Sequence, residues 1–271
     1  MKNIFNLGIE IEGLLNNDMI NFQIREYHHG VKIPKLEWKA ERDSSIRLST
    51  GIDFDVTPIE LISGVIKCPS EFKKEIDKFI KYFSINYSLE LNDVFVFNKS
   101  CGSHIHVSIN RKPHYFYKKG LNKCFIQTRK KFYNKIRESN IPKNIQTKIL
   151  RNYNRYHAQQ SWITFNRSGV TCERNFEFNF ISEFSGKGIE WRALNMNGIE
   201  TWEQFREFWN IVYDCVKYLI KSTRKWSNYE TFRINMKEKD IKVYLKPINQ
   251  VVYFDNLRFG QFSDYRWGEH V

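Results

Sequence analysis

Residues 100–108 read SCGSHIHVS, an apolar run that carries His104 and His106 two positions apart. Side chains with this spacing on a β-strand point to the same face of a sheet. Two imidazoles on an inner strand are costly to bury unless something binds them. The pattern therefore favours a ligand-binding face, while two ordinary buried histidines are the alternative that this single motif leaves open.

Acidic side chains recur with similar spacing on other segments that alternate like strands. Residues 3–13 place Glu10 and Glu12 on one face and an apolar set on the other. Two further strands, joined by a polar turn, are expected at 36–48, which carries Asp43, and at 57–66, which carries Glu60. Ordinary solvation would explain any one of these motifs, so only their convergence in space would indicate a site.

The remaining segments predict a sheet covered by amphipathic helices. Further strands are expected at 93–98, 103–110, 174–182 and 188–195, and helices at 70–83, 114–138, 142–160 and 201–226. Several adjacent strands are linked too briefly for parallel crossovers, which need about a dozen residues or more. An antiparallel or mixed α+β sheet follows.

Length and composition predict one large soluble domain. The chain has 271 residues, of which 41% are hydrophobic and 16% aromatic. No apolar stretch approaches the ~18 residues of a membrane-spanning helix, and the N-terminal segment MKNIFNLGIEIEG carries acids where a signal peptide is apolar. Five cysteines form no CxxC pair, and Cys101 is expected to be a buried small hydrophobe rather than a ligand. We therefore expect a cytoplasmic protein with reduced thiols and no membrane partner.

The chain is strongly basic. Its formal net charge is +13, from 43 Lys and Arg against 30 Asp and Glu, and such an excess attracts phosphates, acidic metabolites or nucleic acid. The basic residues are scattered through many segments rather than collected in one arm. This distribution is typical of solvated helix faces, so nucleic acid is a partner that the charge permits without favouring.

The predicted strands would form a divalent-metal site if they neighbour one another. Their carboxylates would then converge with Glu190 and Arg192 of the segment GIEWRALN, and like charges so close raise one another's pKa values unless cations compensate. Carboxylates with an occasional imidazole suit Mg²⁺ or Mn²⁺, whereas zinc would favour cysteines or more histidines. The face therefore fits an ion that holds phosphate oxygens, with Arg192 as fixed positive charge for a transferring phosphoryl group. The chain lacks P-loop, Rossmann and protein-kinase motifs, so any nucleotide site is of another type.

Seven segments resemble, in order, the motifs of the amidoligase family, a branch of the carboxylate-amine ligases with the glutamine synthetase-like fold. They are GIEIEG (8–13), ERDSSI (41–46), PIELIS (58–63), SCGSHIHVS (100–108), RNYNRYHA (151–158), RNFEFNF (174–180) and GIEWRALN (188–195). The resemblance covers roughly residues 4–220, and its CG-x-H-x-H and E-x-R elements are the most specific. The second motif satisfies the usual D-x-S pattern, whereas the third lacks the proline that often follows ELIS.

The resemblance implies a fold and an activity. The fold is a curved antiparallel or mixed sheet of about six strands with helices on its convex side, in a domain of residues 1–226 with a helical insertion at about 114–160. Residues 227–271 would be a C-terminal extension packed on the same domain. The activity is that of an ATP- and Mg²⁺-dependent ligase, in which a phosphorylated carboxylate is attacked by an amine to give an amide or isopeptide bond.

The resemblance also assigns residues, motif by motif. Ligands of the metal that bridges the ATP phosphates would be Glu10, His104 and Glu190, and ligands of the metal nearer the acceptor would be Glu12, Glu60 and Asp43. Catalytic contacts to the ATP phosphates would be His106, Arg174 and Arg192, and a clamp for the carboxylate substrate would be Arg151 and Arg155.

Two other functions stay open on the sequence. A nucleic-acid-binding protein would use the basic charge and the aromatic residues around 115–117 and 153–156. A metal-dependent hydrolase would use the same carboxylates and histidines without a nucleotide. For the ligase, we expect the partners to be a carboxylate substrate and an amine substrate, either small molecules or peptides.

Overall fold

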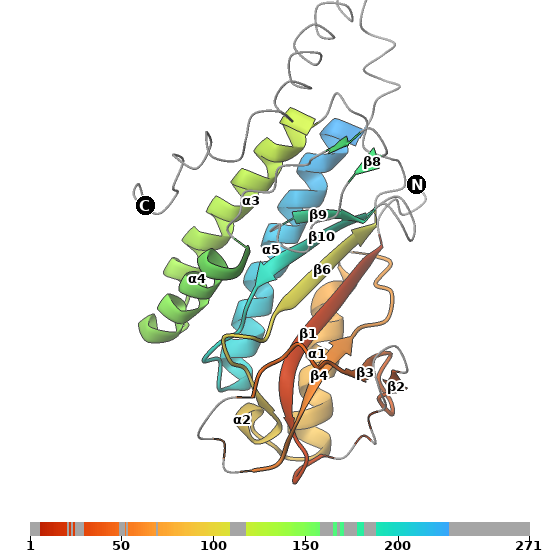
Figure 1. The fold of residues 1–271 in the computed structure, drawn as a ribbon, viewed down its shortest axis with the longest axis vertical. Helices are drawn as coiled ribbons and strands as arrows, with labels where there is room; N and C mark the ends of the chain where they lie inside the picture. The colour runs from red at the N-terminus through yellow and green to blue at the C-terminus, as the bar shows by residue number, and fades with distance from the viewer. Residues whose placement is uncertain are drawn as a thin grey trace, which may run out of the picture.

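One antiparallel sheet organises the fold (Figure 1). The computed structural model describes residues 6–20, 22, 24, 30–48, 52, 54–68, 70–108, 118–157, 165–166, 169–170, 178–181 and 188–227. The strands of the sheet are β1 (Leu7–Asn16), β2 (Val31–Lys32), β3 (Lys39–Arg42), β4 (Val56–Ile62), β5 (Phe95–Val96), β6 (Ser103–Ser108), β9 (Phe178–Ile181) and β10 (Gly188–Leu194). Their order is β2-β3-β4-β1-β6-β10-β9, with β5 also paired to β1, and every pairing is antiparallel. The expected antiparallel α+β sheet is therefore confirmed.

The sheet has eight strands rather than the six or so expected, and some boundaries differ. Strands β2 and β5 are two residues long, too short to show alternation. The segment 93–98 was expected to be a strand, but it starts inside helix α2 (Leu91–Val94), where the Glu90 N–H donates to Asp93 Oδ2 at 3.0 Å in a capping box. Strand β3 ends at Arg42 because Asp43 opens a turn, accepting the Ser45 N–H at 2.8 Å.

The longer helices occupy the segments where amphipathic periodicity predicts them. They are α1 (Glu71–Asn86), α3 (Lys118–Glu138), α4 (Lys143–His157) and α5 (Trp202–Ser227). At the start of α5, the Gln204 N–H donates to Thr201 Oγ1 at 3.3 Å, which satisfies one of the free donors of the first turn. None of the described helices is apolar over a length that would cross a bilayer. A separate two-stranded ribbon pairs β7 (Phe165–Asn166) with β8 (Gly169–Val170), and residues 228–271 lie outside the described part of the chain.

An aromatic core fixes α1 and α5 to one face of the sheet, behind the strands in Figure 1. Leu7, Ile9 and Ile11 of β1 are no more than 2% exposed and face this core. Phe79 of α1 lies at its centre, with ring centroids 4.8 Å from Trp38, 5.0 Å from Phe83 and 5.7 Å from Phe205. Because β1 alternates, this packing turns Glu10 and Glu12 to the opposite face.

We expect Phe79→Ala to lower the free energy of unfolding by about 3–5 kcal/mol, because it removes a fully buried ring and leaves a cavity in the core. Urea denaturation followed by circular dichroism measures the change. Ile85→Ala, on the same helix at a side chain that is 65% exposed, should cost less than about 0.5 kcal/mol. Equal losses in the two variants would contradict this account of the core.

Candidate metal centre

Residues from four strands meet on the face of the sheet that the described helices leave uncovered. In the strand register Glu12 lies opposite Glu60, Glu10 opposite His104, and His106 opposite Glu190. Directly paired residues project from the same side of an antiparallel sheet. Strands β1, β4, β6 and β10 therefore present these polar side chains on one surface.

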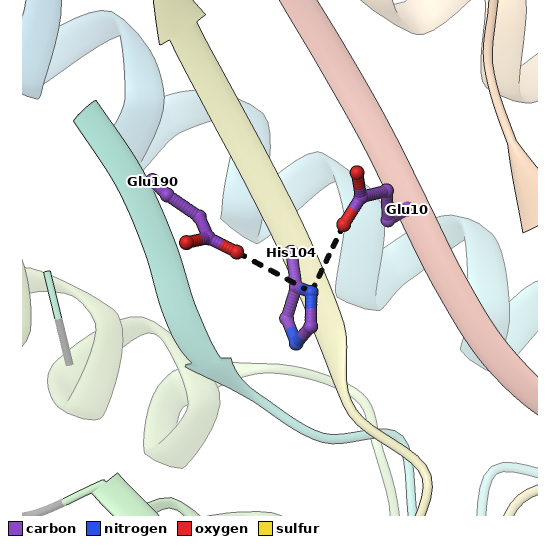
Figure 2. Close-up of side chains that lie close together, drawn as sticks. All are labelled: Glu10, His104 and Glu190. Carbon is purple, nitrogen blue, oxygen red and sulfur yellow. Dashed lines mark hydrogen bonds and ion pairs between the residues drawn. The ribbon is translucent and has the colours of Figure 1, made fainter. Parts of the chain in front are cut away.

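His104 lies at the centre of this surface. Its Nδ1 is 3.0 Å from Glu10 Oε2 and 3.6 Å from Glu190 Oε1, as Figure 2 shows for the three neighbouring strands. Its Nε2 is 3.6 Å from Glu12 Oε1. The side chain is only 5% exposed, and its two ring nitrogens face three carboxylates inside the protein, Glu10 and Glu190 at Nδ1 and Glu12 at Nε2.

Two sets of three potential metal ligands result. Glu10, His104 and Glu190 form one, Glu12, Glu60 and His104 form the other, and within each set the ligand atoms lie within 4.8 Å of one another. Carboxylate oxygens with one imidazole are a donor set that Mg²⁺ and Mn²⁺ accept. The two sets contain every residue expected to bind metal except Asp43.

A histidine and an arginine border the first set. His106 Nε2 is 2.9 Å from Glu10 Oε1 and 3.9 Å from Glu190 Oε1. Arg192 donates from Nη1 to Glu190 Oε1. The Nε of Arg192 is buried and has no hydrogen-bond acceptor among the residues that the structure describes. A guanidinium with a free donor beside a metal-type carboxylate set is suited to contact an anionic ligand.

Glu10 and His106 stabilise each other's charged forms. Burial opposes ionisation of Glu10, but its hydrogen bonds with His104 and His106 outweigh burial and hold the pKa of this carboxyl below its usual range. Burial likewise opposes the charged form of His106, but the hydrogen bond and the charge of Glu10 raise the pKa of the imidazole. This edge of the site therefore pairs a carboxylate with a histidine, and their contact favours the charged form of each.

The second carboxylate set behaves in the opposite way. Burial raises the pKa of Glu12, although His104 and the Gly102 N–H act against it. Burial and the nearby charges of Glu10, Glu12 and Asp43 raise the pKa of Glu60 to about 9. Glu60 therefore retains its proton at neutral pH unless a cation compensates the charge of the set, which is the behaviour of a metal-binding set.

Gly102 and Glu41 are two residues of the site that the sequence analysis did not single out. The Glu12 N–H donates to the Gly102 carbonyl at 3.0 Å, and the Gly102 N–H donates back to the Glu12 carboxylate. One glycine therefore holds both the backbone and the side chain of Glu12. Glu41 of β3 is buried and lies opposite Glu60 in the register. The glycine follows Cys101 in the histidine motif, but no pattern in the sequence shows which carboxylate its N–H reaches.

The other predicted residues are placed only in part. Asp43 lies close enough to raise the pKa values of Glu12 and Glu60, but it belongs to neither three-ligand set in the described structure. Arg151 is an exposed residue of α4. Arg155 is on the same helix with its side chain outside the described atoms, and Arg174 lies outside the described residues. Roles for the three arginines therefore stay predictions.

Cys101 is buried, as expected, and its thiol does not join the metal-type sets. Burial raises the pKa of this thiol to about 12, so it is neutral at pH 7. The side chain packs with Leu14 and Ile46 in a small apolar cluster. Asn195 donates to the Cys101 carbonyl, which ties the start of the histidine strand to the end of β10.

Comparison with models of known protein families gives no match, and a search of curated proteins finds no matching sequence.

Glu60→Gln should stabilise the metal-free protein at high pH. A carboxyl whose pKa rises from 4.5 in the unfolded chain to about 9 in the folded state favours folding while it is protonated. That contribution is complete below pH 4.5 and is lost as the pH rises towards 9, and glutamine removes the loss. In EDTA, the melting temperature of the variant should exceed that of the wild type at pH 8.5 but not at pH 5, by about 2–4 °C per kcal/mol.

Glu37→Gln is the matched control, because Glu37 is an exposed partner of Lys32 at 3.1 Å. Its melting curve should follow the wild type at every pH. Added Mn²⁺ should stabilise the wild type more than the Glu60→Gln protein. If the melting temperatures of the wild type and Glu60→Gln changed with pH in parallel, the pKa of Glu60 would not be raised in the folded state.

Gly102→Ala should weaken divalent-metal binding. A Cβ at this position would lie 3.0 Å from Glu12 Oε2 and 3.1 Å from His104 Nε2, so both potential ligands must shift. Loss of ligand positioning typically reduces metal affinity by about 10-fold or more. Mn²⁺ titration followed by electron paramagnetic resonance measures the change. Gly8→Ala on the same face, where the added Cβ would make an ordinary 3.6 Å contact with His106, should retain full affinity.

Proposed function

We propose that this chain is an ATP-dependent carboxylate-amine ligase of the amidoligase type, with the curved, glutamine synthetase-like sheet of that family. The observation that carries the proposal is the meeting of two acidic ligand sets at His104, beside Arg192, whose Nε is buried. A cytoplasmic location, which is part of the proposal, fits an enzyme that uses ATP.

The ligand sets fit two divalent ions. Glu10, His104 and Glu190 would hold the ion that bridges the ATP phosphates, and Glu12 and Glu60, with Asp43, would hold the ion nearer the acceptor. Burial and the charges of neighbouring carboxylates raise the pKa of Glu60 to about 9, so a cation is the natural partner of this set. Mg²⁺ or Mn²⁺ there would neutralise the charge that accumulates on a phosphoryl group during transfer.

The protein's own cations would provide further contacts to the substrates. Arg192 has a buried Nε without an acceptor in the described structure, and that N–H would donate to a phosphate oxygen. His106, whose pKa is raised beside Glu10, would supply a second positive group. Arg174 would add a third contact to the ATP phosphates. Arg151 and Arg155 of α4 would hold the carboxylate of the substrate.

The proposed reaction has two steps. A carboxylate oxygen of the substrate attacks the γ-phosphorus of ATP, the bond to the β-phosphate oxygen breaks, and ADP leaves. The amine nitrogen then attacks the acyl carbon, loses a proton, and phosphate leaves with the electron pair of the C–O bond. Phosphorylation is needed because a free carboxylate would have to expel oxide, a far poorer leaving group than phosphate.

Binding and trapping experiments test this function without knowledge of the natural substrate. Calorimetry should detect a nonhydrolysable ATP analogue binding in Mg²⁺ and not in EDTA. In a second assay, hydroxylamine replaces the amine in a mixture of ATP, Mg²⁺ and glutamate or aspartate. If the acyl phosphate of the acid forms, it should give a hydroxamate, which ferric ion colours. Arg192→Gln should reduce hydroxamate formation by about 10²–10³-fold, because a donor to the transferring phosphate is lost.

Arg206→Gln is the matched control, since Arg206 pairs with Asp77 at 3.2 Å on an exposed surface. It should retain full activity. Analogue binding that survives EDTA, or that is unchanged in Glu190→Gln, would overturn the proposal. Metal-dependent hydrolysis of esters or amides without nucleotide would instead identify the hydrolase alternative.

A further inference from the structure

A basic groove opens in the helical layer, away from the carboxylate face. It has a volume of about 640 Å³ and lies between α3 and α5, lined by Lys131, Lys135, Asp214, Lys217, Tyr218, Ile220 and Lys221. Phe132 of α3 packs on Trp191 with ring centroids 5.5 Å apart, and Trp191 faces the side of β10 opposite Glu190. The sheet therefore separates this groove from the candidate metal centre.

The charge of the groove is strongly one-sided. Four lysines face one aspartate, which leaves a formal charge of +3 (four minus one) among the lining residues. Asp214 lies 2.7 Å from Lys135 and 3.8 Å from Lys217, so it compensates mainly the first of these. On each helix the two lysines are four residues apart, which is one turn or about 6 Å along the axis. The groove thus presents two parallel rows of positive charge.

Tyrosine rings lie among these lysines. The Lys131 ammonium is 5.9 Å from the Tyr218 ring centroid. The Lys217 and Lys73 ammoniums are 4.9 Å and 5.2 Å from the Tyr213 ring centroid, so two like charges share one ring. Both tyrosines are partly exposed. An anion bound beside these lysines would reduce the repulsion between their charges.

We propose that the groove between α3 and α5 binds single-stranded nucleic acid through its phosphate backbone. Positive grooves with aromatic side chains beside them are the usual means of holding single strands, because bases stack on the rings while phosphates contact the cations. The basic side chains that line the groove are all lysines, which act as point charges and lack the planar fork that reads bases. Binding should therefore depend on salt and not on sequence.

Both helices carry further basic residues in their sequences. Residues 118–123 at the start of α3 read KKGLNK, and residues 223–227 at the end of α5 read TRKWS. These two helix ends lie at the same end of the molecule in Figure 1. The chain is therefore also basic in sequence at this end of the helix pair.

Fluorescence anisotropy on the full chain tests the proposal. The probes are labelled (dT)20, a mixed-sequence single strand of equal length, its duplex, and labelled polyglutamate, in EDTA without ATP. Both single strands should bind equally and more tightly than the duplex and polyglutamate. Neutralisation of phosphates by four lysines predicts a slope of about −3 for log K against log salt.

Lys131→Glu/Lys217→Glu should weaken (dT)20 binding by at least about tenfold and reduce the salt slope by roughly 1.4, since two phosphate contacts are lost. Because charge reversal could disturb the helix pair, Lys131→Gln/Lys221→Gln is the second variant and should show the same direction. Lys35→Glu/Lys39→Glu, with the same charge change at the opposite edge of the sheet, should bind like the wild type. Melting curves establish that each variant is folded.

Three results would overturn the proposal. The first is that (dT)20 does not bind at 50 mM salt. The second is that the groove and control variants lose (dT)20 affinity equally. The third is a preference for polyglutamate, which would identify an acidic polypeptide as the occupant. The measurement is independent of the proposed ligase, because it contains neither metal nor ATP. Glu190→Gln should bind (dT)20 normally even if it has no ligase activity.

Discussion

The register between β1 and β6 is the constraint on which the site depends. It sets Glu10 opposite His104, and antiparallel alternation then turns Ile9 and Ile11 to the aromatic core. A shift of one residue would reverse both faces of the strand and bury carboxylates against Phe79 and its neighbours. The apolar face of β1 therefore holds the register, and the register in turn brings the acidic and imidazole groups together.

The site is stable only because the opposite face of the sheet is strongly apolar. Burial first, and then the charges of neighbouring carboxylates, raise the pKa values of Glu12 and Glu60, so the fold holds these groups where their charged forms are disfavoured. The packing of aromatic rings between α1, α5 and the sheet offsets this cost. Such local repulsion is typical of binding sites, where a ligand completes an arrangement that the protein alone leaves under strain.

The two layers of the molecule carry opposite chemical character. Carboxylates dominate the uncovered face of the sheet, while lysines line the groove between α3 and α5. The chain's charge of +13 is thus not uniform over its surface. A metal-dependent reaction on one layer and phosphate binding on the other would be physically independent, because the buried core lies between them.

The sequence by itself determined the long helices, the main strands and the residue types of the candidate metal centre, because periods of two and of 3.6 residues are local properties of the chain. Only the tertiary structure decided that His104 faces two carboxylate sets, that Gly102 holds Glu12, and that Lys131 and Lys217 share a groove. The two-residue strands and α2 also escaped prediction, since so few residues show no period. The contacts of His104, Gly102 and the two lysines join residues that are distant in sequence. Side-chain spacing along one segment carries no information about which other segment lies beside it.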